Sequence, residues 1–235
     1  MYSTKASDLR VKPVKMDTDL PIPGIHEPLH NTSFCYILCG GPGSGKSTTL
    51  KNLLTQKHMF GRKYDRVEIY SPSLSTIDFP IDPKRLHTEI NVTEIQKTMN
   101  DLEEGESCLF VFDDAPTLIP RGKDGLVLAR MCMNRRHLSK GKGSFCSVLI
   151  TTQKMNMLPT SIRAAANALF LWRSASEREL KTVYDEYISD LSESDFRSLC
   201  DFVWKKNTHE FLFIRLDRLK EHGKYHASFE EIKFF

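Results

Sequence analysis

The sequence lacks any long hydrophobic run. Apolar stretches such as CLFVF (108–112) and ALFLW (168–172) are far shorter than a membrane-spanning helix of about 20 residues. The first residues include Lys5, Asp8 and Arg10 in place of an apolar core, so we expect no secretory signal peptide. These absences indicate a soluble, intracellular protein.

Cysteine pairs with the spacing of a metal site are also lacking. Six cysteines are present, and most lie inside apolar stretches, where a free thiol behaves as a small buried hydrophobe. Cys35 and Cys39 are close in sequence, but no second Cys or His pair completes a zinc site. The pattern indicates a reducing compartment, and the sequence shows neither internal repeats nor low-complexity tracts.

The net charge is small, at +3, so overall charge alone does not indicate a nucleic-acid partner. Its distribution is uneven, because the segment 121–154 contains a single acidic residue, Asp124. Its basic residues are Arg121, Lys123, Arg130, Arg135, Arg136, Lys140, Lys142 and Lys154. Such a segment is either a solvated face or a contact for an anionic partner.

The 235 residues suit one substantial α/β domain. Residues 1–33 are polar, contain several prolines and show no regular period, so we expect an N-terminal extension or arm, followed by a domain at 34–220 and a C-terminal tail at 221–235. The apolar patterns predict strands at 34–39, 66–71, 108–113, 146–152, 168–172 and 209–216, and helices at 45–57, 93–103, 124–137, 159–167, 176–188 and 192–203. Continuous apolar strands that alternate with helices predict a mainly parallel central sheet covered by helices on both faces.

The segment CGGPGSGKST (39–48) fits the phosphate-binding pattern G-x-x-x-x-G-K-[ST]. An apolar strand precedes it and a helix with leucines at i, i+3 and i+4 follows it, which is the context that a P-loop requires and a mere Gly-rich turn does not. In a P-loop the backbone amides and the helix N-terminus hold the phosphates of ATP, the lysine reaches the β- and γ-phosphates, and the serine hydroxyl ligates Mg²⁺. The predicted nucleotide-binding residues are Gly40, Gly41, Pro42, Gly43, Ser44, Gly45, Lys46, Ser47 and Thr48.

Two further strands end in polar residues. CLFVFDD ends in Asp113 and Asp114, and ligands of open α/β sheets bind at the carboxyl ends of strands. Asp113 is then the candidate Mg²⁺ ligand and Asp114 the candidate base for the attacking water; the alternative is a helix cap before the turn APT. VLITTQ ends in Gln153, whose amide can contact the γ-phosphate and the attacking water.

The stretch between these two strands is basic. Arg135 and Arg136 lie at the end of a predicted helix, where they either interact with the helix dipole or act as an arginine finger on the transferring phosphoryl group. Lys140 and Lys142 are interleaved with glycines, which suits mobile contacts to nucleic-acid phosphates.

Taken together, GGPGSGKS, LFVFDD, NRRH, LITTQ and LPTSIRAAANALFLWR resemble the viral DNA-packaging ATPases of the FtsK–HerA superfamily. The similar branch is that of poxviruses, other large DNA viruses, virophages and polinton-like elements. The resemblance covers about residues 34–216. It departs from many relatives at Asp114, where they have glutamate.

The resemblance implies a RecA/FtsK–HerA-like P-loop ATPase that forms a pentameric or hexameric ring and pumps double-stranded DNA into a preformed capsid. It also implies that Arg135 or Arg136 acts on the neighbouring subunit, that capsid or portal-vertex proteins are partners, and that the protein works in the infected cell, in a cytoplasmic factory or the nucleus, or with the virion. Two alternatives stay open: a small P-loop nucleoside or nucleotide kinase, and a nucleotide-dependent switch of the helicase-loader type.

Overall fold

The computed structural model describes residues 20–74, 79, 81–119, 122–136, 141–174, 176–205 and 209–234. The strands are β1 (Cys35–Cys39), β2 (Arg66–Tyr70), β3 (Leu86–His87), β4 (Ser107–Phe112), β5 (Phe145–Thr152), β6 (Ala168–Trp172), β7 (Phe211–Arg215), β8 (Tyr225–Ala227) and β9 (Glu230–Glu231). The helices are α1 (Lys46–Thr55), α2 (Val92–Asn100), α3 (Ala115–Leu118), α4 (Lys123–Asn134), α5 (Thr160–Arg163), α6 (Glu177–Tyr187) and α7 (Glu193–Trp204), with short 3-10 helices η2 (Pro83–Arg85), η3 (Met155–Met157) and η4 (Lys220–His222).

The strands form one sheet in the order β3-β2-β4-β5-β1-β6-β7-β8-β9 within the described residues. Strands β3 to β6 of this order are parallel to one another, whereas β7, β8 and β9 are each antiparallel to the preceding strand. The central strands β4, β5, β1 and β6 are buried along their whole length, which explains their uninterrupted apolar sequence. The predicted mainly parallel α/β sheet is confirmed.

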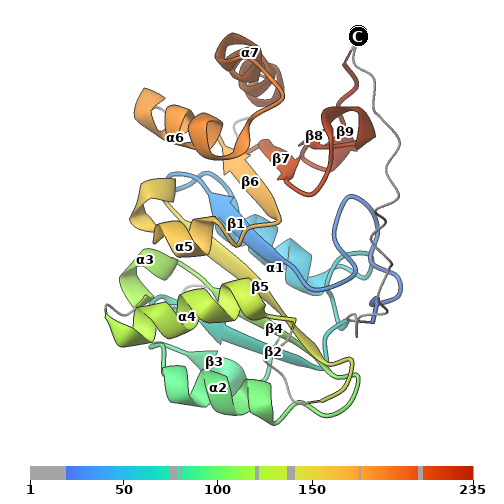
Figure 1. Ribbon diagram of the computed structural model, residues 1–235, viewed down its shortest axis with the longest axis vertical. Helices are drawn as coiled ribbons and strands as arrows, with labels where there is room; N and C mark the ends of the chain where they lie inside the picture. Colours follow the sequence, from blue (N-terminus) through green and yellow to red (C-terminus); the bar gives the residue numbers. More distant parts are fainter. Residues whose placement is uncertain are drawn as a thin grey trace, which may run out of the picture.

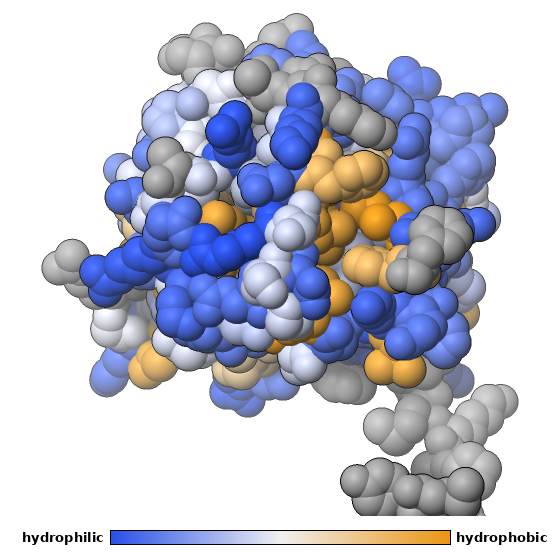
Figure 2. Space-filling view, turned by 90° about the horizontal axis from the view of Figure 1, so that it is seen from above, coloured by the Kyte–Doolittle hydropathy of each residue, from blue (hydrophilic) through white to orange (hydrophobic). Residues whose placement is uncertain are grey.

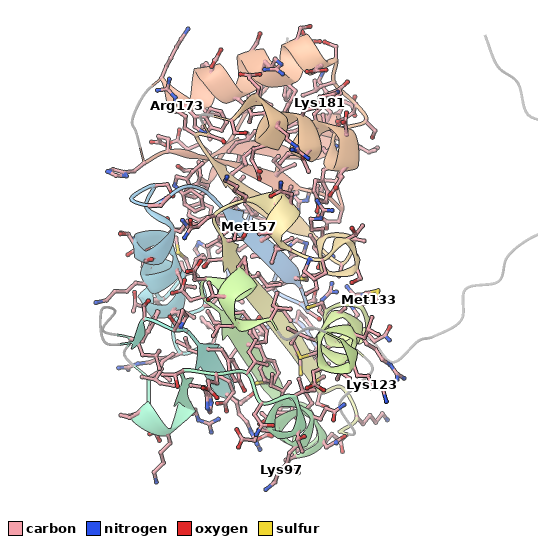
Figure 3. The ribbon with its side chains drawn as sticks, turned by 90° about the vertical axis from the view of Figure 1, so that its left-hand side faces the viewer. Lys97, Lys123, Met133, Met157, Arg173 and Lys181 are labelled. Atoms are coloured by element: carbon pink, nitrogen blue, oxygen red, sulfur yellow. The ribbon has the colours of Figure 1, made fainter. Side chains whose placement is uncertain are left out.

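The two faces of the sheet are covered unequally. One hydrophobic cluster packs α2, α4, α6 and α7 against one face (Figure 1). The other face is covered by α1 and by loop residues such as Phe60 and Tyr64. Figure 3 shows the sheet between these layers, with α1 on one side and α2 and α4 on the other. Helix α1 begins after the carboxyl end of β1, so its N-terminus lies at the end of the sheet where the parallel strands finish.

The segments at both ends of the described chain belong to this fold. Ile22 and Leu29, from the expected N-terminal arm, are buried in the α1 cluster. The half-buried His30 contacts the Tyr36 hydroxyl of β1 (2.6 Å) and the Asp217 carboxylate (3.2 Å), and its partial burial lowers its pKa. In the expected tail, β8 and β9 extend the sheet and Tyr225 is fully buried. Residues on both sides of the expected boundaries at 33 and 220 thus pack against the same sheet. Residues 1–19 and Phe235 lie outside the described chain.

Asn167 joins the starts of β1 and β6 to the end of α4. Its side-chain oxygen accepts a hydrogen bond from the backbone N–H of Cys35, at the start of β1 (2.8 Å). The same oxygen accepts a bond from the guanidinium of Arg135, at the end of α4. Because Asn167 immediately precedes β6, this cluster lies at the amino-terminal edge of the parallel strands. Asn167 therefore holds β1, β6 and α4 together at the end of the sheet opposite the P-loop.

The cysteines are all buried and free. In the part of the chain that the structure describes, no helix combines the length and apolarity that crossing a membrane requires. The end of the molecule that carries α6 and α7 is mostly hydrophilic, with hydrophobic residues exposed in one area (Figure 2). Ion pairs such as Arg197–Glu193 (2.9 Å) and Lys181–Asp185 (3.1 Å) account for part of this polar surface.

Candidate functional site

The loop between β1 and α1 has the backbone conformation of a phosphate-binding loop. Gly43 and Gly45 have positive φ angles of 71° and 108°, which side-chain-bearing residues rarely adopt. At Gly40 a Cβ atom would lie 2.7 Å from Ser44 Oγ and 2.8 Å from Trp172 Cβ, so only glycine fits at this position. The three glycines allow the chain to turn tightly into the N-terminus of α1, where anions bind.

Lys46 closes back over its own loop. Its ammonium donates hydrogen bonds to the carbonyls of Gly40 (2.5 Å) and Gly41 (2.9 Å). Burial lowers the pKa of Lys46, and the negative charges of Asp113 and Asp114 oppose that shift. The lysine therefore lies within electrostatic reach of both carboxylates, although they follow a strand that does not pair with β1.

Asp113 follows β4 and is held from two sides. Its Oδ2 accepts from the Ser71 hydroxyl at the end of β2 (3.0 Å), and its Oδ1 accepts from the Thr151 hydroxyl at the end of β5 (2.8 Å). The residue is only 6% exposed. A carboxylate fixed in this way, with one strand between it and the P-loop strand, suits a hard cation such as Mg²⁺.

Asp114 adopts the left-handed conformation with φ of 50°, which is uncommon for a residue other than glycine. Its backbone N–H donates to the Thr151 hydroxyl at 2.7 Å, so the bond to β5 holds this conformation. Asp114 occupies the N-cap position of α3, but its side chain makes no capping hydrogen bond to the described residues of that helix. The helix-cap interpretation therefore does not account for this carboxylate.

Gln153 comes directly after β5, and β5 lies between β1 and β4. The last residues of β1 and β5 are paired, and the Gly40 N–H donates to the Thr152 carbonyl at 3.1 Å. The exposed Gln153 side chain therefore starts beside the P-loop, on the side that faces the acidic pair. The structure brings Lys46, Asp113, Asp114 and Gln153 to the same edge of the sheet.

The basic candidates lie elsewhere. The Arg135 guanidinium is buried and donates to the Cys132 carbonyl (2.7 Å) and to Asn167, whereas Arg136 is exposed. Lys142 is exposed on a loop whose backbone bonds Gly105, just before β4. Because these residues flank the starts of the strands, they lie at the edge opposite the P-loop. Lys140 lies outside the described residues.

Sequence reasoning missed three residues that support the site. Ser71 ends the predicted strand 66–71, and its hydroxyl holds Asp113. A polar residue at the end of an apolar strand is the same signal that identified Asp113 as a site residue. Glu179 on α6 is 4% exposed and accepts from the Met155 N–H (2.5 Å) and the Cys39 thiol (3.4 Å), so it joins η3 to the start of the P-loop. His209 lines a hollow together with Gly43–Thr49 of the P-loop and α1. It reaches this position because β7 runs antiparallel to β6 and so begins beside the P-loop.

Comparison with solved structures identifies the fold. The chain is similar to the DNA-packaging ATPase B204 from Sulfolobus turreted icosahedral virus, with 15% identity, a TM-score of 0.54, and coverage of 78% of this chain and 93% of that one. It is also similar to the genome-packaging NTPase B204 from Sulfolobus turreted icosahedral virus 2 in complex with sulfate, with 14% identity, a TM-score of 0.57, and coverage of 85% and 98%. The fold is that of a P-loop NTPase.

The second virus's B204 has also been solved with AMPPCP, at 12% identity, a TM-score of 0.53 and coverage of 79% of this chain and 93% of that one. No protein-family model matches the chain, and no curated protein sequence matches it. These three neighbours are structures of viral genome-packaging NTPases, and they share their fold with this chain.

Proposed function

We propose that this protein is an ATP-hydrolysing motor that moves double-stranded viral DNA into a preformed capsid. The observation that carries the proposal is the convergence of Lys46 with Asp113 and Asp114 at one sheet edge, with β5 and Gln153 between them. A P-loop with an acidic pair and a polar strand end suits the attack of water on the γ-phosphate. The B204 neighbours, which are packaging NTPases, support the further step to DNA packaging.

In this proposal the residues divide the work as follows. The amides of Gly43–Thr48 and the Lys46 ammonium hold the triphosphate. To reach it, the Lys46 ammonium must first leave the Gly40 and Gly41 carbonyls. Ser47 and Asp113 would hold Mg²⁺, which neutralises phosphate charge when bound. Asp114 takes a proton from the attacking water, and Gln153 orients that water and contacts the γ-phosphate.

A trans-acting arginine remains part of the proposal, and it now rests on Arg136. The Arg135 side chain is buried against Asn167, so it cannot extend into a neighbour without breaking that contact. Arg136 lies far from the P-loop of its own chain but is exposed, as a residue that completes a neighbour's site in a pentameric or hexameric ring must be. Lys140 and Lys142 follow it as candidate contacts to DNA phosphates, and the capsid vertex is the proposed destination of the DNA.

The nucleotide chemistry is tested with two substitutions. Lys46→Ala should abolish ATP binding and hydrolysis, because the amides alone do not balance the triphosphate charge. Asp114→Asn should keep ATP binding and lower kcat by about 10²–10⁴-fold, the loss expected for a positioned general base. Asparagine also tolerates the left-handed conformation, so this change removes charge and keeps the backbone. Normal hydrolysis by Asp114→Asn would exclude Asp114 as the base.

The link to DNA is tested by measuring phosphate release with and without duplex DNA. A packaging motor should release phosphate without any acceptor substrate, which a nucleoside kinase does not do, and DNA of any sequence should stimulate the rate. Lys140→Ala combined with Lys142→Ala should weaken the steep salt dependence of that stimulation and spare the basal rate. Negligible turnover with DNA present would instead favour a nucleotide-dependent switch.

Sharing of the site between subunits is tested by mixing two inactive proteins. Arg136→Ala and the double variant Asp113→Ala, Asp114→Ala should each be inactive alone, since a trans-acting arginine contributes about 10³–10⁵-fold to kcat. A mixed ring contains interfaces in which an intact acidic pair faces an intact Arg136, so activity should return on mixing. Mixed rings that form but stay inactive would show that Arg136 does not act in trans.

A further inference from the structure

His209 reaches the P-loop because the direction of the chain reverses at β7. Strands β1 and β6 are parallel and end beside the P-loop, whereas β7 is antiparallel to β6 and starts at that same edge. His209 comes two residues before Phe211, the first residue of β7. A residue far from the P-loop in sequence is therefore placed at its rim.

The contacts of His209 fix it against that rim. The Trp172 indole N–H donates to the His209 backbone carbonyl (3.0 Å), and the His209 Nδ1 lies 3.3 Å from the Ser44 carbonyl. A Cβ atom on Gly45 would be 3.6 Å from the His209 ring, so the imidazole lies directly beside the last glycine of the loop. Together with residues Gly43–Thr49, the exposed His209 side chain lines a hollow of about 360 Å³.

The order of the strands indicates how a nucleotide is oriented in the hollow. Asp113 and Asp114 follow β4, on the β5 side of the P-loop, while His209 lies on the β6 and β7 side. In phosphoryl transfer the attacking water and the leaving group lie roughly in line on opposite sides of the γ-phosphate. When the water is held near the acidic pair, the rest of the nucleotide extends away from it, toward β6, β7 and His209.

We propose that His209 forms the nucleoside subsite of the P-loop, with its imidazole stacked against the base of the bound nucleoside triphosphate. The inference rests on the proposed ATPase function and adds to it the group that contacts the nucleoside. In the described part of the hollow, His209 is the lining residue that does not come from the loop or α1. A flat ring at the rim contacts a nucleobase, whereas the amides of the loop contact phosphates.

The test compares ATP with inorganic tripolyphosphate, which carries the phosphates without a nucleoside. His209→Ala should weaken ATP binding about tenfold, within the range found when a stacking ring is removed from beneath a base. Tripolyphosphate binding should stay unchanged. His209→Phe keeps a flat ring and should keep most of the ATP affinity. Lys46→Ala is the matched control and should weaken both ligands, because it acts on the phosphates.

The fold should survive His209→Ala, since Trp172 bonds the backbone carbonyl, which the substitution keeps. Equal weakening of ATP and tripolyphosphate would show that His209 acts by shaping the loop, and it would overturn the subsite. Unchanged ATP affinity in His209→Ala would overturn it as well. If the unmodified protein bound neither ligand, the proposed ATPase function would fail together with the subsite, a result that differs from both of these.

Discussion

Thr151 provides the sharpest test of how the acidic pair is held. Its hydroxyl donates to Asp113 Oδ1 at 2.8 Å and accepts from the Asp114 N–H at 2.7 Å, and the residue is 1% exposed. Thr151→Val replaces the hydroxyl by a methyl group of nearly the same size. The change therefore removes one buried and one partly buried hydrogen bond and leaves the packing of β5 intact.

The expected loss of stability follows from those two bonds. A hydrogen bond to a charged group contributes about 1.5–3 kcal/mol, and a buried N–H left without a partner costs about 1–3 kcal/mol. Ser71 still holds the other oxygen of Asp113, and the two losses are coupled, so we expect the free energy of unfolding to fall by about 3 kcal/mol. With a urea m-value of about 2.5 kcal/mol per M, the midpoint should fall by about 1 M.

The assay is urea unfolding together with Mg²⁺-dependent ATP hydrolysis. Thr151→Ser is the matched control, because it keeps the hydroxyl and loses a methyl group, at a cost of about 1 kcal/mol. Loss of a group that orients a metal ligand typically lowers metal affinity or activity 10–100-fold, so Thr151→Val should need more Mg²⁺ for half-maximal rate, and Thr151→Ser should not. If the two variants unfold at the same urea concentration with the same Mg²⁺ requirement, the reasoning about Asp113 and Asp114 is refuted.

Two further predictions concern stability. Arg135→Ala should lower the free energy of unfolding by about 2–4 kcal/mol, because it removes the side-chain donor to the Cys132 carbonyl and one of the two donors to the Asn167 oxygen. Arg136→Ala should change it by less than about 0.5 kcal/mol, and equal effects in urea unfolding would contradict the structural role of Arg135. Burial lowers the pKa of His226 to about 4, and its Nδ1 has no hydrogen-bond partner among the described residues. Between pH 6.5 and 4, His226 is therefore protonated in the unfolded chain but neutral in the folded protein. The folding stability that His226 contributes is complete above pH 6.5 and falls by up to about 1.4 kcal/mol per pH unit below it. His226→Leu should therefore lose less stability than the unmodified protein between pH 7.5 and pH 5, and a difference independent of pH would contradict this.

The sequence by itself predicted the longer strands and helices and the position of the P-loop. Apolar strands that are buried on both faces need uninterrupted hydrophobic sequence, and a P-loop needs its glycines at fixed spacing, so both are visible locally. The polar ends of β4 and β5 were predictable for the same reason, because a polar residue that closes a buried strand must lie at the edge of the sheet. The short strands β8 and β9 were not predicted, since three and two residues show no period.

Only the tertiary structure decided which polar residues act together. Arg135 and Arg136 are equivalent in sequence, and the side on which each leaves the end of α4 makes one a buried partner of Asn167 and the other an exposed cation. Ser71, Thr151 and His209 come from three separate strands or their ends, and they reach the site through the order and direction of those strands. The order of the strands and the reversal of direction at β7 follow from long-range packing, which combines segments far apart in the chain, and no local pattern of residues contains that information.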